Sequence, residues 1–145
     1  MISQIVKINA DGVHLGKNDM PIAEARKVLG NKFIIGGTVN SFEDVLQHLQ
    51  GATTNYFGCG PFRFTSTKKN LSPILGVEGY LNIIHQMRDS HIYVPLIAIG
   101  GISKNDILPL LESGVNGFAL SSSVLHADNP IKEMDELMNL IQTKY

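Results

Sequence analysis

The sequence has little that would point to a secreted or membrane-bound protein. Among its 145 residues there is one cysteine, Cys59. A single cysteine excludes an internal disulfide framework, which fits a reducing compartment. No apolar run approaches the ~20 residues that cross a bilayer, and the first residues lead into a patterned segment rather than a signal peptide. We therefore expect a cytoplasmic protein with no membrane partner.

The chain also lacks an excess of charge of either sign. Its formal net charge is -1 at pH 7, which gives no reason to expect nucleic acid or an anionic membrane surface as a partner. Apolar residues make up 43% of the sequence, enough to bury one core. We expect residues 1–145 to form a single domain or part of one.

Short apolar runs recur along the chain, and each closes with glycine or a hydroxyl residue. They show little alternation between apolar and polar positions, which is typical of strands buried on both faces of a parallel sheet. The runs are residues 12–16, 33–37, 56–60, 94–101 and 117–122.

Segments with helical periodicity separate these runs. Ser41 and Ser103 stand where a helix N-cap is expected, and Pro130 suits the first turn of a final helix. Residues 2–8 resemble the end of a further helix. The apolar stripes predict helices within residues 22–29, 42–49, 80–87, 107–111 and 130–141.

Strict alternation of strand and helix indicates a parallel sheet with crossover helices. An open doubly wound sheet is disfavoured, because no G-x-G-x-x-G string opens a helix and glycine-rich ends follow several strands. A (β/α)8 TIM barrel is favoured, but a complete barrel has eight strands in about 250 residues. We therefore predict a truncated barrel with about five β-α units, or a chain that closes in another way.

Every candidate functional group follows directly after a predicted strand. In a parallel sheet these positions share the C-terminal rim, where barrel enzymes do their chemistry. The groups are Asp19, Thr38, the segment Thr65–Lys69, Gly100-Gly101 and Ser121-Ser122.

The residue types at this rim suit phosphate. Lysines, hydroxyls and backbone N–H groups released by glycine are the usual ligands of phosphate oxygens. Gly100-Gly101 precedes a predicted helix start, and barrels often hold phosphate after their last two strands. The pattern predicts a phosphorylated or diphosphorylated small substrate, with Mg²⁺ at Asp19.

Plainer interpretations stay open at several positions. Asp19 could cap a helix before Pro21, and the 65–70 segment could be an ordinary solvated loop. Gly100-Gly101 could be a simple turn. His14 is better explained as a hydrogen-bonded interior histidine than as a catalyst, and Cys59 as a small core residue.

Five strings, in fixed order and spacing, together resemble the thiamine-phosphate synthase family. They are "ADGVHLGKND", "GPFRFTSTKK", "LGVEG", "VPLIAIGGI" and "GVNGFALSSSVL". The resemblance implies a (β/α)8 barrel and a transferase of thiamine biosynthesis. Such an enzyme joins hydroxymethylpyrimidine diphosphate to a thiazole phosphate, giving thiamine phosphate and diphosphate.

The resemblance also assigns roles to residues of this chain. Asp19 would bind Mg²⁺, and Thr38 would contact the pyrimidine substrate where the family usually has serine. Lys68 would hold the departing diphosphate as the catalytic lysine. The thiazole phosphate would be bound by Thr65, Ser66, Thr67, Gly101, Ser121 and Ser122.

Departures from the family pattern are also visible. The family's Gln-x-Arg-x-Lys and Asn-Asp-Asp strings, which bind the pyrimidine diphosphate and metal, are absent, and Asn40 replaces the histidine of G-x-S-x-H. Two alternatives therefore stay open, a thiazole tautomerase-like isomerase and a non-catalytic phosphate-binding remnant. We also expect poor activity from the chain alone and self-association through exposed sheet edges.

Overall fold

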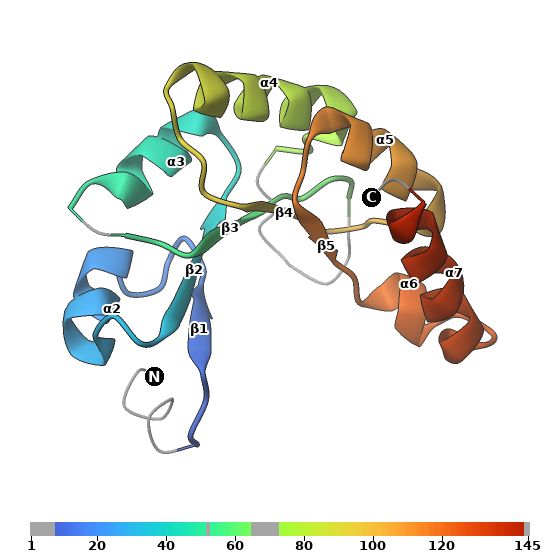
Figure 1. Ribbon diagram of the computed structural model, residues 1–145, viewed down its shortest axis with the longest axis horizontal. Helices are drawn as coiled ribbons and strands as arrows, with labels where there is room; N and C mark the ends of the chain where they lie inside the picture. Colours follow the sequence, from blue (N-terminus) through green and yellow to red (C-terminus); the bar gives the residue numbers. More distant parts are fainter. Residues whose placement is uncertain (1–7, 52, 65–72, 144–145) are drawn as a thin grey trace.

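A parallel sheet of five strands, with helices along one face, forms the framework of the computed structural model (Figure 1). The structure describes residues 8–51, 53–64 and 73–143. The strands follow one another in chain order, and each pairs in parallel with the next. They are β1 (Gly12–Leu15), β2 (Ile34–Val39), β3 (Tyr56–Cys59), β4 (Leu96–Ile99) and β5 (Gly117–Ala119).

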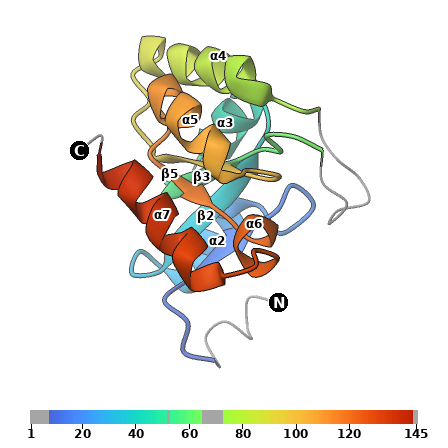
Figure 2. The same ribbon diagram turned by 90° about the vertical axis from the view of Figure 1, so that its right-hand side faces the viewer.

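Helical segments connect the strands and follow the last one. Figure 2 shows α4, α5 and α7 following one another along the outer side of the sheet. The helical segments are α2 (Ile22–Leu29), α3 (Phe42–Leu49), α4 (Gly76–Asp89), the 3-10 turn η1 (Lys104–Asp106), α5 (Ile107–Ser113), α6 (Ser122–Leu125) and α7 (Pro130–Gln142).

Local sequence signals explain where α3 and α7 begin. Ser41 accepts a hydrogen bond from the N–H of Asp44, whose carboxylate accepts in return from the N–H of Ser41, a capping box that starts α3. Asn129 accepts from the N–H of Lys132 in front of α7. These caps satisfy N–H groups that a helix start leaves without helical partners.

The two faces of the sheet carry different side chains. Residues on the outer face pack against the helices, and several of them are fully buried, as for Ile35, Phe57 and Ala98. Their neighbours in sequence lie on the opposite face, which we call the inner face. Figure 1 shows the helices arranged as an arc along the outer side of the sheet. Since successive strand residues alternate between faces, Thr38 lies on the inner face.

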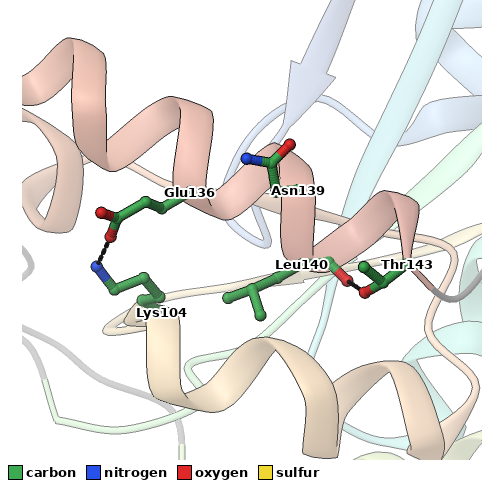
Figure 3. Close-up of a pocket in the computed structure, with 5 residues that line it drawn as sticks. All are labelled: Lys104, Glu136, Asn139, Leu140 and Thr143. Carbon is green, nitrogen blue, oxygen red and sulfur yellow. Dashed lines mark hydrogen bonds and ion pairs between the residues drawn. The ribbon is translucent and has the colours of Figure 1, made fainter.

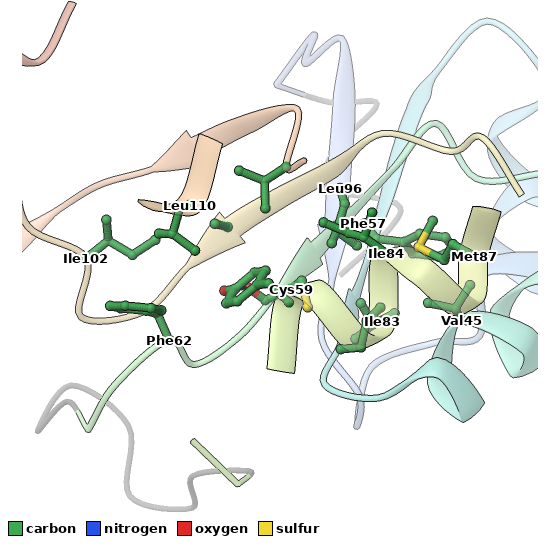
Figure 4. Close-up of a cluster of buried hydrophobic side chains, with 14 of the residues drawn as sticks. Val45, Phe57, Cys59, Phe62, Ile83, Ile84, Met87, Leu96, Ile102 and Leu110 are labelled. Carbon is green, nitrogen blue, oxygen red and sulfur yellow. Dashed lines mark hydrogen bonds between the residues drawn. The ribbon is translucent and has the colours of Figure 1, made fainter. Parts of the chain in front are cut away.

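The main core lies between the outer face and α3, α4, α5 and α7 (Figure 4). Phe57 and Cys59 of β3 lie at its centre, with Ile83 and Leu110 contributed by the helices. The hydroxyl of Tyr80 donates a hydrogen bond to the carbonyl of Cys59, which ties α4 to the end of β3. Burying each large apolar side chain is worth about 1.5–3 kcal/mol, so this layer holds the strand ends in place.

The predicted order of strands and helices is confirmed, with differences at the ends of β2 and β5. Thr38 was expected to follow the 33–37 run, but β2 continues to Val39 because Thr38 and Val39 still pair with Gly58 and Cys59 of β3. The 117–122 run was expected as one strand, but β5 ends at Ala119 and Ser122 opens α6. The reason is that the carbonyl of Ser121 accepts from the N–H groups of Val124 and Leu125, which turns the chain into a helix. The helix expected in residues 2–8 lies outside the described residues. In the described ranges, no helix combines the length and apolar composition needed to cross a membrane.

Candidate functional site

Parallel pairing brings the ends of all five strands to one edge of the sheet. Thr38 lies in β2, opposite Gly58 of β3. Ile99 pairs with Ala119, and Gly101 and Ser121 each lie two residues beyond the ends of these neighbouring strands. Thr38, Gly101 and Ser121 therefore lie on or just beyond the same rim.

The predicted residues Thr65, Ser66, Thr67 and Lys68 lie outside the described residues. The chain on either side of them is described, and it is joined at the rim. The N–H of Leu75 donates to the carbonyl of Pro61 at 3.1 Å, and the N–H of Gly76 donates to the carbonyl of Phe62 at 3.0 Å. The described residues on either side of the lysine motif, one stretch after β3 and the other at the start of α4, therefore lie next to each other.

The side chain of Asp19 closes the turn that follows β1. Its Oδ2 accepts a hydrogen bond from the N–H of Gly16 at 2.7 Å, and its own N–H donates to the carbonyl of Gly16. Helix α2 is capped at Pro21, without a side-chain hydrogen bond. The alternative interpretation of Asp19 as a helix cap is therefore wrong, and the carboxylate remains a candidate metal ligand.

A polar cluster on the inner face surrounds the hydroxyl of Thr38. His14 Nε2 lies 2.9 Å from Thr38 Oγ1, and His14 Nδ1 lies 3.1 Å from the hydroxyl of Tyr56. The His14 and Tyr56 rings stack with centroids 5.5 Å apart. The imidazole thus links the candidate substrate contact in β2 to the tyrosine in β3.

Two glycines make room for these rings. A methyl group on Gly36 would lie 2.2 Å from the Tyr56 ring, and one on Gly58 would lie 2.7 Å from Cε1 of His14. The hydrogen-bonded role expected for His14 is confirmed, although its side chain is exposed on the inner face rather than enclosed. Tyr56 was missed, because the aromatic residue at the start of an apolar run looks like core.

Two left-handed glycines turn the chain directly after β4. Gly100 has φ 87° and Gly101 has φ 75°, a conformation that residues with a side chain rarely adopt. A methyl group on Gly100 would also lie 2.9 Å from Pro61. Ser121 and Ser122, on the neighbouring strand end, are both exposed.

An ion pair that the sequence analysis did not identify stands beside this turn. The guanidinium of Arg63 contacts the carboxylate of Asp106 through two hydrogen bonds of 2.8 Å. Burial raises the pKa of the Asp106 carboxyl, but hydrogen bonds from Arg63 and Ser103 outweigh it, so the pKa lies below its ordinary value. The two residues are 43 positions apart, and no motif joins them.

A pocket of about 330 Å³ lies elsewhere, between η1 and α7 (Figure 3). Its lysine, Lys104, is already paired with Glu133 at 2.9 Å and with Glu136. Because these carboxylates satisfy the ammonium group and the pocket holds none of the predicted residues, the rim is the better candidate site. The pocket is lined by Lys104, Glu136, Asn139, Leu140 and Thr143.

The described residues contain no group of three or more histidine, cysteine, aspartate or glutamate side chains arranged to hold a metal ion. A magnesium site built on Asp19 would therefore have at most two such side chains from the described part of the chain. Mg²⁺ is commonly bound by one or two carboxylates together with substrate phosphates and water. The donor set fits a metal held jointly with a phosphorylated substrate.

Comparison with known proteins gives consistent matches. The family model described as thiamine monophosphate synthase matches residues 2–124. The chain is 55% identical over 139 residues to a thiamine-phosphate synthase of Phocaeicola vulgatus, covering 96% of this chain and 66% of the relative. It is 57% identical over 134 residues to that of Bacteroides thetaiotaomicron, covering 92% of this chain and 64% of the relative. The chain thus spans slightly less than two thirds of these relatives.

A solved structure gives the same result for the fold. Thiamine phosphate pyrophosphorylase from Pyrococcus furiosus superimposes with a TM-score of 0.82 at 31% identity, covering 99% of this chain and 65% of that structure. The predicted α/β fold of the barrel type, represented here by five β-α units, is confirmed.

Proposed function

The chain belongs to the thiamine monophosphate synthase family, and from this premise we propose that it acts in the synthesis of thiamine phosphate. The reaction is a transfer that joins hydroxymethylpyrimidine diphosphate to a thiazole phosphate and releases diphosphate. The observation that carries the proposal is the pairing of Ile99 with Ala119, which brings Gly101 and Ser121 to neighbouring strand ends. Each of these residues stands at its place in a family motif.

The thiazole phosphate is assigned to this edge. Gly101 would offer its backbone N–H, and Ser121 and Ser122 would offer hydroxyl and backbone N–H groups. Thr65, Ser66 and Thr67 would complete the subsite. Phosphate oxygens accept several hydrogen bonds at once, so converging donors bind this group better than a lone cation does.

The pyrimidine is assigned to the inner face beside Thr38. The hydroxyl of Thr38 is oriented by its hydrogen bond to His14. The other ring nitrogen of His14 is held by the hydroxyl of Tyr56. A hydroxyl held in this way presents its remaining hydrogen-bonding positions in a fixed direction. Fixed polar groups align a ring better than mobile ones, which is what a reaction between two bound rings needs.

The chemistry requires charge stabilisation more than a nucleophile on the protein. As diphosphate leaves, the pyrimidine methylene becomes electron-poor and the thiazole nitrogen attacks it. Lys68 is assigned to the oxygens of the departing diphosphate, and a group that neutralises them lowers the barrier. Asp19 would hold Mg²⁺, which when bound supplies further neutralising charge to the leaving group.

The experiment is an assay for thiamine phosphate with both substrates and Mg²⁺. It compares this chain with a version that carries the N-terminal third of the Phocaeicola vulgatus relative. We expect the extended version to be much faster, because alignment of two substrates contributes roughly 7–11 kcal/mol. Lys68→Ala in the extended version is the matched control, and we expect it to be nearly inactive.

Two results would contradict the proposal. A folded extended version that forms no thiamine phosphate, under conditions in which the relative does, would refute the transferase assignment. An extended Lys68→Ala variant with full activity would refute the role of that lysine.

Three other expectations remain predictions. They are the single-domain boundary, the cytoplasmic location and the self-association of the chain.

A further inference from the structure

Arg63 joins three elements of the rim. Its chain position follows β3, while its guanidinium pairs with the carboxylate of Asp106 in η1 through two hydrogen bonds of 2.8 Å each. Nη1 of Arg63 also donates to the carbonyl of Gly101 at 3.1 Å. One side chain therefore fixes both the turn after β4 and the helical turn that follows it.

Asp106 transmits this connection to the next residue of the turn. Its Oδ2 accepts from the N–H of Ser103 at 2.8 Å and from the Ser103 hydroxyl at 2.7 Å. The carboxylate is 11% exposed, whereas Arg63 is 50% exposed. Planar two-point pairing between a guanidinium and a carboxylate restricts direction as well as distance. Asp106 thus connects the side chain of Arg63 to Ser103, which follows the Gly100-Gly101 turn. The turn is held on the side where Arg63 lies.

Contact with Gly101 is close enough to depend on the absence of a side chain. A methyl group on Gly101 would lie 2.7 Å from Cγ of Arg63 and 3.1 Å from its carbonyl oxygen. The Arg63 guanidinium also lies over the Phe62 ring, 4.9 Å from its centroid. The stem and head of Arg63 are therefore both held against the rim.

The direction of the Gly101 carbonyl determines that of the next N–H group. In a trans peptide, the carbonyl and the following N–H point to opposite sides. When Arg63 binds the carbonyl of Gly101, the N–H of Ile102 is turned away from Arg63. The position of a backbone donor at the rim thus depends on a side chain that need not touch the substrate.

We propose that Arg63 is a positioning residue for phosphate binding: its guanidinium, held by Asp106, binds the carbonyl of Gly101 so that the N–H of Ile102, which follows the Gly100-Gly101 turn, faces the phosphate of the thiazole substrate. The inference rests on the proposed function, because that function supplies the phosphate. It adds a residue and a role that the family motifs do not assign to this chain.

The test measures binding of thiazole phosphate and of inorganic phosphate to the chain by calorimetry. The variants are Arg63→Gln, Asp106→Asn and the double variant, with Lys132→Gln as a control on α7, where the ion pair to Glu136 is 3.8 Å long. We expect each single variant to bind thiazole phosphate about tenfold more weakly. The double variant should be no weaker than either single one, because both break the same connection.

A direct contact between Arg63 and phosphate would give a different pattern. Removing Asp106 would then free the guanidinium, so Asp106→Asn would bind as tightly as the wild type or more tightly, and this result would overturn the proposal. Equal binding by wild type and Arg63→Gln would also overturn it. If the wild-type chain bound neither ligand, the phosphate subsite of the proposed function would fail, and this inference with it.

Two further measurements distinguish a variant that fails to fold from one that folds but no longer positions the Gly100-Gly101 turn. Arg63→Lys keeps the charge and most of the stem but cannot form the two-point pair, so we expect it to fold and still bind weakly. In the extended version, we expect a higher KM for thiazole phosphate, with kcat and the KM for the pyrimidine diphosphate unchanged. A fall in kcat alone would contradict a role confined to phosphate positioning.

Discussion

Nδ2 of Asn40 lies 2.8 Å from the carbonyl oxygen of Pro73, which is 33 residues further along the chain. The same amide group donates to the carbonyl of Gly60 at 3.0 Å, and Asn40 is only 7% exposed. One side chain at the end of β2 thus joins the residue after β3 to the chain that approaches α4. It fixes the two described ends between which the lysine motif lies.

Replacing Asn40 with alanine should destabilise the protein. The change removes two hydrogen bonds and leaves the buried carbonyl of Gly60 without this donor, which costs roughly 1–3 kcal/mol. Urea unfolding measures the difference. Asn139→Ala is the matched control, because Asn139 is an exposed asparagine on α7. If both variants unfolded at the same urea concentration, the amide bridge would contribute nothing.

The contribution of Asp106 to stability should depend on pH. Its pKa is lowered in the folded chain, so its stabilising effect is present above the ordinary aspartate pKa of about 3.9 and is lost as the pH falls through the lowered value. We expect Asp106→Asn to be less stable than wild type at pH 7, with a difference that shrinks below about pH 4.

Comparing the wild type with Asp106→Asn removes the contribution of other titrating groups to the pH dependence of stability. Burial raises the pKa of Asp44, but its contacts with Lys17 and the N–H groups of Asn40 and Ser41 outweigh this and lower it. Asp44 is present in both proteins, so its share cancels. Urea unfolding at pH 7 and pH 3 provides the measurement. A difference of the same size at both values would show that the charge of Asp106 is not what stabilises the fold.

Cys59 should be unreactive while the protein is folded. The side chain is fully buried in β3, and burial, with a smaller effect from Asp44, raises the pKa of its thiol to about 12. Thiolate is the reactive form, and little is present at pH 8. We expect an aromatic disulfide reagent to label the thiol only in urea. Rapid labelling without urea would mean that β3 opens readily.

Much of this fold follows from local sequence patterns, whereas the rim contacts do not. The capping box at Ser41 and the helix start at Pro130 depend on neighbouring residues, so short patterns predict them. Pairs such as Arg63 with Asp106 join distant segments and leave no periodic signal. Asp19 shows the same limit on a smaller scale, because a carboxylate before proline suggests a cap, but its partner is the preceding turn.

The chain should self-associate as its concentration rises. Strands β1 and β5 are the edges of the five-stranded sheet, and such edges pair readily. Apolar side chains are also exposed on α7, including Ile131 at 77% and Met138 at 44%. Sedimentation velocity should show faster species at higher concentration, and Ile131→Lys with Met138→Lys should reduce them. A sedimentation coefficient that stays at the monomer value over this range would contradict the prediction.

The inner face should not tolerate a side chain at Gly36. A methyl group there would lie 2.2 Å from the Tyr56 ring, which stacks on His14. The ring would have to move and break its hydrogen bond to His14, and overpacking of this kind costs roughly 1–3 kcal/mol.

Gly117→Ala is the matched control, since its methyl group would meet only the flexible end of Ile97, at 3.3 Å. We expect Gly36→Ala to unfold at clearly lower urea and to shift the His14 ring resonances, with little change in Gly117→Ala. Because His14 also holds the hydroxyl of Thr38, pyrimidine diphosphate binding should weaken with Gly36→Ala alone. Equal stability of the two variants would mean that the Tyr56 ring moves without cost, and the support that we assign to Thr38 would then be absent.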